Sequence, residues 1–258
     1  MKVISLVNQK GGVAKTTTAA ALADYFARNG KKTLLIDFDP QGSLTTAFGL
    51  ADDSDSPQAL RFLGIEKSES LIEPQVINSM LHIITSNIGL EKANLTLPQK
   101  YGKERYLRRA IDKIAQKEKY EYVVLDSNPS FSQLTINVLY ASDSVIVPFK
   151  PEFNSFNGIK QLFENIEEMK EIQPNLDVLG FVVTMARKTK STEEAISAIK
   201  QFAEEQCSRV FLPVIRLAVA AADAPSHGKS LYDYMPQSDV AKDYERVARK
   251  ILESLERF

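Results

Sequence analysis

The stretch "NQKGGVAKTTTAA", residues 8–20, decides the fold. It follows the apolar run 3–7, which we predict to be a buried strand, and it opens a segment of helical composition, 15–29, that ends before Gly30. The next apolar run, "TLLID" at 33–37, predicts a second buried strand. A strand, a glycine loop, a helix and a strand in this order predict a parallel sheet with helices packed on it.

The glycine loop has the spacing of a phosphate-binding site. Glycines let the backbone approach a ligand with its N–H groups turned inward, and the helix that follows adds partial positive charge at its N-terminus. We expect Lys15 to reach the β- and γ-phosphates of a nucleotide, the Thr16 hydroxyl to ligate Mg²⁺, and Thr17 to bond the α-phosphate. The predicted nucleotide contacts of the loop are Gly11, Gly12, Val13, Ala14, Lys15, Thr16 and Thr17.

Carboxylates close two of the predicted strands. Asp126 ends the apolar run 122–126, where a phosphate-loop NTPase places the carboxylate that supports Mg²⁺, and Asp37 and Asp39 lie at the end of "LLIDFDPQG". The carboxyl ends of strands in an open α/β sheet form the crevice in which ligands bind. A second lysine, Lys10, stands just before the glycine pair, and its spacing alone shows only that it is near this site.

The remaining pattern and the composition are those of a globular α/β protein. We expect further strands at 81–85, 144–148, 178–184 and 209–215, and helices at 105–117, 159–172, 193–206 and the C-terminus. The 258 residues, 44% hydrophobic and 25% charged, contain no low-complexity linker, so we predict one doubly wound ATPase domain over residues 1–258. The net charge of −1 excludes a chain that is basic throughout, and one cysteine, Cys207, suits a reducing cytoplasm.

Five segments resemble the ParA-type ATPases of the deviant Walker A class, which also includes MinD. They are "KGGVAKTT", "LLIDFDPQGSLT", "YVVLDSNPSFSQLT", "ASDSVIVPFKPEFNSFNGI" and "APSHGKS", and together they cover nearly the whole chain. The resemblance implies that Lys10 reaches across a dimer to the partner's nucleotide and that Asp39 positions the attacking water. It also implies that Lys15 is the ordinary phosphate-loop lysine and that Asp37 and Asp126 support Mg²⁺.

The family resemblance further implies a switch that binds ATP and Mg²⁺, forms a nucleotide-sandwich homodimer and hydrolyses ATP slowly until a partner stimulates it. That partner is a ParB-like protein or a cargo adaptor. The expected function is segregation or positioning of plasmid DNA, chromosomal DNA or another cargo in the cytoplasm, with the nucleoid as matrix. Because the chain begins directly at the first strand, we expect no N-terminal helix-turn-helix domain.

Two basic runs are candidates for non-specific contacts with double-stranded DNA. One supplies Arg187, Lys188 and Lys190, and the other lies on the predicted helix near 103–119. Taken alone, a run of this kind is more often a solvated helix face or loop. Ala220 falls where many relatives carry an arginine, and Arg216 is nearby but displaced, so DNA contacts are redistributed or weaker.

Other readings of the phosphate loop remain. A MinD-like membrane role would need a cationic amphipathic tail, whereas glutamates balance the basic residues of "DYERVARKILESLERF". An iron–sulfur reductase would need more than one cysteine, and the loop alone does not exclude a metabolic ATP-dependent ligase. His227 in "APSHGK" has either a structural role or that of a catalytic base, and phosphate hydrolysis requires no histidine.

Overall fold

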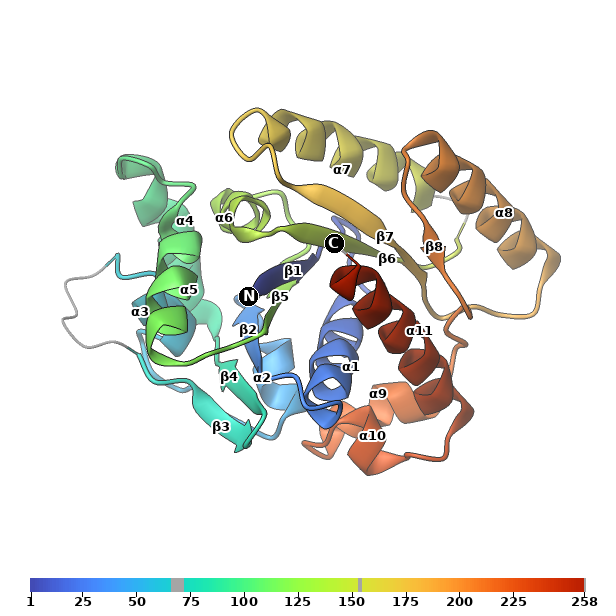
Figure 1. Cartoon of the computed structure of the whole chain (residues 1–258), viewed down its shortest axis with the longest axis horizontal. Coiled ribbons are helices and arrows are strands. Elements are labelled where there is room, and N and C mark those ends of the chain that lie inside the picture. The colour runs from blue at the N-terminus through green and yellow to red at the C-terminus, as the bar shows by residue number, and fades with distance from the viewer. Residues whose placement is uncertain (66–71, 153–154, 258) are drawn as a thin grey trace.

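The computed structural model describes residues 1–65, 72–152 and 155–257, and its centre is one eight-stranded sheet with the strand order β3-β4-β2-β5-β1-β6-β7-β8 (Figure 1). The strands are β1 (Lys2–Leu6), β2 (Thr33–Phe38), β3 (Gln75–Asn78), β4 (Leu81–Ile84), β5 (Tyr122–Ser127), β6 (Ser144–Phe149), β7 (Asp177–Val183) and β8 (Val210–Phe211). Neighbouring strands run parallel except β3, which is antiparallel to β4 at the sheet edge. The predicted doubly wound, mostly parallel α/β fold is confirmed.

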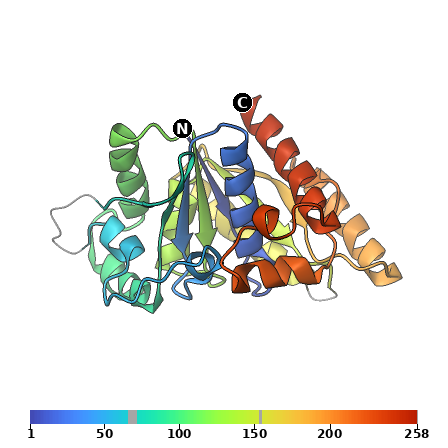
Figure 2. The ribbon, with the colours of Figure 1, turned by 90° about the horizontal axis from the view of Figure 1, so that it is seen from below.

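Helices cover both faces of the sheet (Figure 2). One face carries α1 (Lys15–Arg28), α2 (Ser43–Ala47), α9 (Val219–Ser226), α10 (Leu231–Tyr234) and α11 (Asp239–Glu256). The other carries α3 (Gln58–Phe62), η1 (Ile88–Leu90), α4 (Glu91–Thr96), η2 (Leu97–Gln99), α5 (Tyr106–Lys117), α6 (Gln133–Ala141), α7 (Ser155–Lys170) and α8 (Lys190–Glu205).

Each central strand is buried on both faces because its side chains alternate between the two helical layers. In β2, Leu34 and Ile36 face the layer of α3 to α8, and Leu35 faces the layer of α1 and α11. All three are fully buried. This two-sided burial explains why the strands read as continuous apolar runs, and it fixes the polar residues that follow them at one edge of the sheet.

The amphipathic C-terminal helix belongs to the core. The apolar face of α11 is buried against α1 and the sheet, as the burial of Tyr244, Val247 and Ile251 shows. Its pattern therefore serves packing, as the balance of charges in the tail favoured. Within the described residues, no helix is both long and apolar enough to cross a membrane.

The last predicted strand is much shorter than expected. The pattern at 209–215 predicted a strand along its whole length, whereas β8 comprises Val210–Phe211 alone. Pro213 has no N–H group to donate to a ladder, and the chain rejoins the edge of β7 only where Ile215 N donates to Val183 O at 2.7 Å.

Candidate functional site

The register of the sheet brings two carboxylates together at its carboxyl edge. Asp37 of β2 lies directly opposite Asp126 of β5, and Asp126 lies opposite Leu6 of β1 on its other side. The glycine loop begins soon after β1, so it lies next to Asp126, and Asp37 lies one strand further along the same edge. The sequence separates these residues by up to 120 positions, and the order β2-β5-β1 makes them neighbours.

The loop exposes unsatisfied backbone donors. Gly12 and Ala14 have φ of 69° and 61°, a left-handed conformation that is uncommon for alanine. Within the described part of the chain, the N–H groups of residues 11–14 have no acceptor, and no side chain caps the N-terminus of α1. A Cβ built on Gly11 or Gly12 would meet nothing within 4 Å. Open space and free donors are what a phosphate requires.

Lys15 and Asp126 occupy the buried floor of the site. Lys15 is only 7% exposed, and this burial lowers the pKa of its amine, which the charges of Asp126 and Asp39 oppose. Burial and the neighbouring Asp37 raise the pKa of Asp126 well above its usual value. Among the residues that the structure describes, none donates a hydrogen bond to either carboxylate oxygen of Asp126, although the Thr16 side chain lies near enough to lower this pKa.

Asp37 and Asp39 are already held by their own segment. Asp37 Oδ2 accepts hydrogen bonds from Thr45 N at 2.8 Å and Thr45 Oγ1 at 2.7 Å, and Asp37 Oδ1 accepts one from Asp39 N at 3.2 Å. Burial nevertheless raises the pKa of Asp37 to about 6. Asp39 Oδ1 accepts from Gln41 N at 3.0 Å, and burial raises the pKa of Asp39 as well.

Lys10 points away from this floor and into its own chain. Its ammonium donates to Glu152 Oε2 at 2.6 Å and to Ser155 Oγ at 3.1 Å, beyond the end of β6 and at the start of α7. Hydrogen bonds and charge from Lys10 and Lys150 lower the pKa of Glu152 to about 2. Asn8 Oδ1 accepts from the Lys10 backbone N at 2.9 Å and fixes the turn before the glycines.

Several residues of the site were not predicted from the sequence. Glu152, Ser155 and Thr45 hold predicted site residues in place. Glu152 had a usable signal, because it follows β6 at the same sheet edge. Residues 153 and 154 of the family-like segment "FKPEFNSF" lie outside the described residues.

A pocket of about 350 Å³ lies beyond the carboxyl ends of β6 and β7. Met185 and Leu217 contribute apolar surface to it, and Arg187 and Thr189 contribute polar groups. Thr184, one residue before Met185, donates from Oγ1 to the loop carbonyl of Val13 at 3.0 Å. The pocket therefore has a fixed position relative to the phosphate loop.

The residues that we predicted to contact DNA lie on two adjacent segments, but not all of their side chains are free to bind a phosphate. Arg187, Lys188 and Lys190 are exposed, and an isolated bridge between Ala186 and Arg216 brings the two segments together. Arg216 is engaged. It bonds the buried Asp243 through Nε at 2.6 Å and Nη2 at 3.1 Å, and Asp239 through Nη1 at 2.6 Å.

The "APSHGK" segment packs against the end of α2. A Cβ on Gly228 would lie 2.7 Å from the Cα of Gly49, so the two backbones touch, and both glycines have positive φ. His227 is exposed, its ring stacks on Tyr234 with centroids 4.7 Å apart, and its Nδ1 lies 3.0 Å from Asp223 O. These contacts favour the structural interpretation of His227.

The residues present fit a Mg²⁺-bound nucleotide. Free N–H donors and a buried lysine suit phosphates, and the orphaned oxygens of Asp126 beside the Thr16 hydroxyl suit a hard cation that keeps waters in its shell. Three other groups of the site, the carboxylates of Asp37 and Asp39 and the ammonium of Lys10, are held by protein partners.

Known proteins resemble this chain over most of its length. Residues 1–178 match the model of the AAA domain family, AAA_31. The chain is 33% identical to the sporulation initiation inhibitor protein Soj of Bacillus subtilis, covering 97% of this chain and 98% of that protein. It is 36% identical to the chromosome-partitioning ATPase Soj of Thermus thermophilus, covering 96% and 94%.

A solved structure of cobyrinic acid a,c-diamide synthase from Mycobacterium smegmatis, with bound ADP and magnesium, superimposes with a TM-score of 0.82. Its sequence is 27% identical, and the superposition covers 99% of this chain and 96% of that one. From the matched domain and the full-length likeness to Soj proteins, we conclude that the chain belongs to the ParA/Soj/MinD family.

Proposed function

We propose that this protein is an ATP-dependent partition ATPase of the deviant Walker A class, a dimerising switch that segregates or positions DNA or another intracellular cargo. One observation carries the proposal: Lys15, Asp126 and the open N–H groups of the loop share one end of the sheet, and Lys10 stands outside them. Lys15, Asp126 and the loop N–H groups are enough to bind one Mg²⁺–nucleotide. Lys10 is not needed there, so it is available to contact the nucleotide of another molecule.

The chain's own groups supply the chemistry of the proposed ATP hydrolysis. The loop N–H groups and Lys15 bind the phosphates and neutralise charge that develops on them, and the Thr16 hydroxyl and Asp126 hold Mg²⁺, with Asp37 in support. When bound there, Mg²⁺ would neutralise negative charge on the phosphates. Asp39 orients the attacking water. The pocket of Met185 and Leu217 receives the nucleoside.

Dimerisation gives Lys10 its role. A lysine delivered from one subunit to the other's nucleotide stabilises transferred charge as an arginine finger does, and it makes ATP part of the interface. ATP then favours the dimer by linkage, and hydrolysis releases it. To act in trans, Lys10 must leave Glu152 and Ser155.

DNA and a protein partner complete the proposed cycle in the cytoplasm. The exposed Arg187, Lys188 and Lys190 are the surface offered to DNA phosphates, whereas Arg216 is already neutralised by two aspartates. The dimer binds double-stranded DNA of the nucleoid without sequence preference, and a ParB-like protein or cargo adaptor stimulates hydrolysis. The likeness to the chromosome-partitioning Soj protein supports this assignment.

Light scattering coupled to size exclusion, with ATP, ADP or no nucleotide, tests the switch. We expect dimers in the presence of Mg²⁺–ATP and monomers with ADP or without nucleotide. Asp39→Ala should bind ATP and dimerise but hydrolyse it about 100-fold more slowly, the scale of a group that orients or accepts a proton in the transition state. Monomers in every nucleotide state would refute the switch, and wild-type turnover by Asp39→Ala would remove Asp39 from the mechanism.

A metabolic ligase is the second candidate, because the superimposed Mycobacterium smegmatis structure is a cobyrinic acid a,c-diamide synthase. Such an enzyme couples ATP hydrolysis to the consumption of a small-molecule carboxylate and an amide donor. Stimulation of turnover by double-stranded DNA with a partition partner favours the switch. Stimulation by cobyrinic acid and glutamine would favour the ligase.

A further inference from the structure

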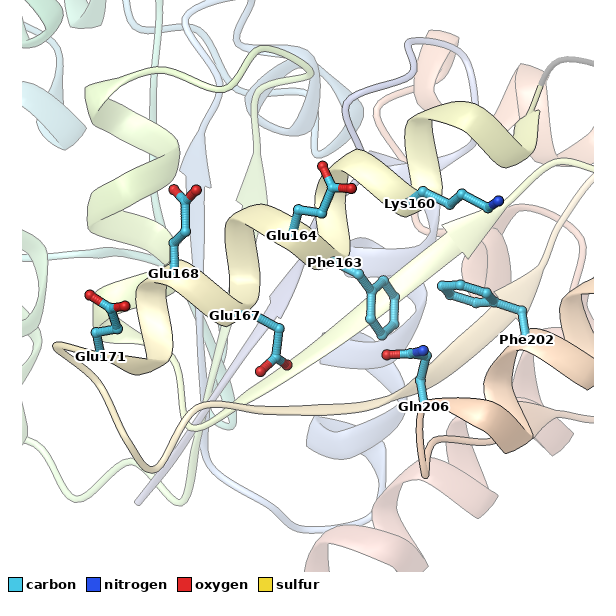
Figure 3. A pocket seen from close by; sticks show the side chains of 8 residues that line it. All are labelled: Lys160, Phe163, Glu164, Glu167, Glu168, Glu171, Phe202 and Gln206. Atoms are coloured by element: carbon cyan, nitrogen blue, oxygen red, sulfur yellow. The ribbon is translucent and has the colours of Figure 1, made fainter.

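A groove of about 570 Å³ runs between α7 and α8, on the helical layer opposite α1 and α11 (Figure 3). Its floor is aromatic. Figure 3 shows Phe163 of α7 and Phe202 of α8 facing each other, and their ring centroids are 5.0 Å apart in an edge-to-face contact. Phe163 also stacks on Phe181 of β7 at 5.7 Å, which anchors the floor to the sheet.

The wall formed by α7 is strongly acidic. Four exposed glutamates line the groove, namely Glu164, Glu167, Glu168 and Glu171, against one lysine, Lys160. Glu167 pairs with Lys170 at 2.7 Å. Among the described residues, the other three have no ion-pair partner. The groove thus joins an apolar floor to uncompensated negative charge.

The placement of these carboxylates is unfavourable for the isolated helix. Glu164 and Glu168 are four residues apart on one stripe, where like charges repel. Glu167 and Glu168 lie in the last turn of α7 and Glu171 lies just beyond it, at the helix end whose partial negative charge favours cations. A positively charged partner on this wall would relieve both effects.

Charge and shape select the occupant. Nucleic acid and anionic lipid are repelled by the four carboxylates, and the described residues contain no group of three or more His, Cys, Asp or Glu side chains that could hold a metal ion. Phe163 is 6% exposed and already stacks on Phe181, so the accessible aromatic surface lies mainly on the half-buried Phe202, which offers a place for an apolar side chain or a guanidinium group. Carboxylates along the wall can take arginine in paired hydrogen bonds.

We propose that the α7–α8 groove docks a short basic segment of another protein, in which arginines flank an aromatic or large aliphatic side chain. The apolar side chain rests on Phe202, at the edge of the buried Phe163, and the arginines pair with Glu164 and Glu168. Neither the nucleotide nor the dimer takes part, so this inference does not depend on the proposed function.

Fluorescence anisotropy on the full chain without nucleotide tests the groove. The probe is a labelled peptide of about 12 residues with arginines on both sides of a central phenylalanine. We expect saturable binding that weakens as salt is raised. A peptide with glutamate in place of arginine should not bind, and one with serine in place of phenylalanine should bind at least about fivefold more weakly, because it cannot use the aromatic floor.

Charge reversal locates the site. E164K/E168K should lower the affinity for the probe peptide about tenfold or more. The matched control E245K/E253K, on exposed positions of α11 on the other face of the sheet, should change this affinity less than about twofold. Circular dichroism and thermal unfolding verify that both variants fold. Absence of saturable binding, equal weakening by the two variants, or equal binding of the serine peptide would each overturn the proposal.

Discussion

The two lysines of one loop, five residues apart, lie in opposite environments. Lys15 is buried among carboxylates at the floor of the site, whereas the Lys10 side chain is 34% exposed and held by Glu152 and Ser155 at its rim. Burial beside Asp126 and Asp39 fixes the first lysine at the floor of the site, whereas an exposed ion pair lets the second change partners at little cost. We infer that Lys15 serves the nucleotide of its own subunit, whereas Lys10 can leave its intrachain partners and contact another molecule.

Removing the buried lysine should have the largest effect. Lys15→Ala deletes a charge-assisted contact with phosphate worth about 3 kcal/mol, so ATP affinity should fall about 100-fold or more. Isothermal titration with Mg²⁺–ATP measures this. Lys10→Ala is the matched control, and its affinity should stay within about threefold of wild type. A similar loss of ATP affinity in both variants would contradict the assignment of different roles to the two lysines.

The exposed lysine should matter to association. Lys10→Ala should weaken ATP-dependent dimerisation about 30-fold or more, the effect of losing about 2 kcal/mol of a charged contact made across an interface. Sedimentation with Mg²⁺–ATP over a concentration series gives the dimer constant. Dimerisation as strong as that of the wild type would contradict the proposed trans role of Lys10.

The buried carboxylates predict an effect of pH on the metal-free and nucleotide-free protein. The folded pKa of Asp37, about 6, is above its unfolded value, so the folded state binds the proton more tightly and lowering the pH stabilises it. Between pH 7 and pH 5 this group should add roughly 1 to 1.5 kcal/mol to the free energy of unfolding.

Denaturant unfolding in EDTA at the two pH values measures this term as a difference between wild type and Asp37→Asn, which cannot titrate. The same pH dependence in both proteins would show that Asp37 is ionised without penalty in the fold. Lys15 and Asp39 titrate in both proteins, whereas Asp37→Asn also removes the charge that raises the pKa of Asp126, so the measured difference includes this coupling.

Removing the ion-pair partner of Lys10 should have the smallest effect on dimerisation. Glu152→Gln removes the ion pair with Lys10 at 2.6 Å and the one with Lys150 at 2.5 Å. Exposed pairs contribute up to about 1 kcal/mol, so release of Lys10 should strengthen ATP-dependent dimerisation by up to about fivefold. Glu118→Gln removes an exposed pair with Lys32 elsewhere and changes the charge equally, so it serves as control. Weaker dimerisation of Glu152→Gln alone would instead give Glu152 a role in the dimer.

The parts of the site that could be predicted from the sequence are those fixed by local order. A loop after β1 and carboxylates at the ends of β2 and β5 must meet, because parallel neighbouring strands end at one edge. The contact between Lys10 and Glu152 joins residues 142 positions apart through side-chain rotamers, and no spacing rule predicts it. The register of Asp37 with Asp126 also needed the structure.

The missed elements lack a clear periodic pattern. Helix α6 is buried around much of its circumference, including the polar Thr135 and Asn137, so no single apolar stripe marks it. Strand β3 is short, polar and on the sheet edge, where the apolar signal is weak. Helix α9 is rich in alanine and contains Pro225, which suggests a loop as readily as a helix.

The contact between Gly49 and Gly228 has a consequence for how this protein tolerates change. Two segments separated by 179 positions meet backbone to backbone, with no side chain between them to yield. Even a methyl group at Gly228 would press on the Gly49 Cα at 2.7 Å and push the end of α2 away from the segment after α9. A side chain at Gly228 therefore does not fit without a shift of one of the two backbones.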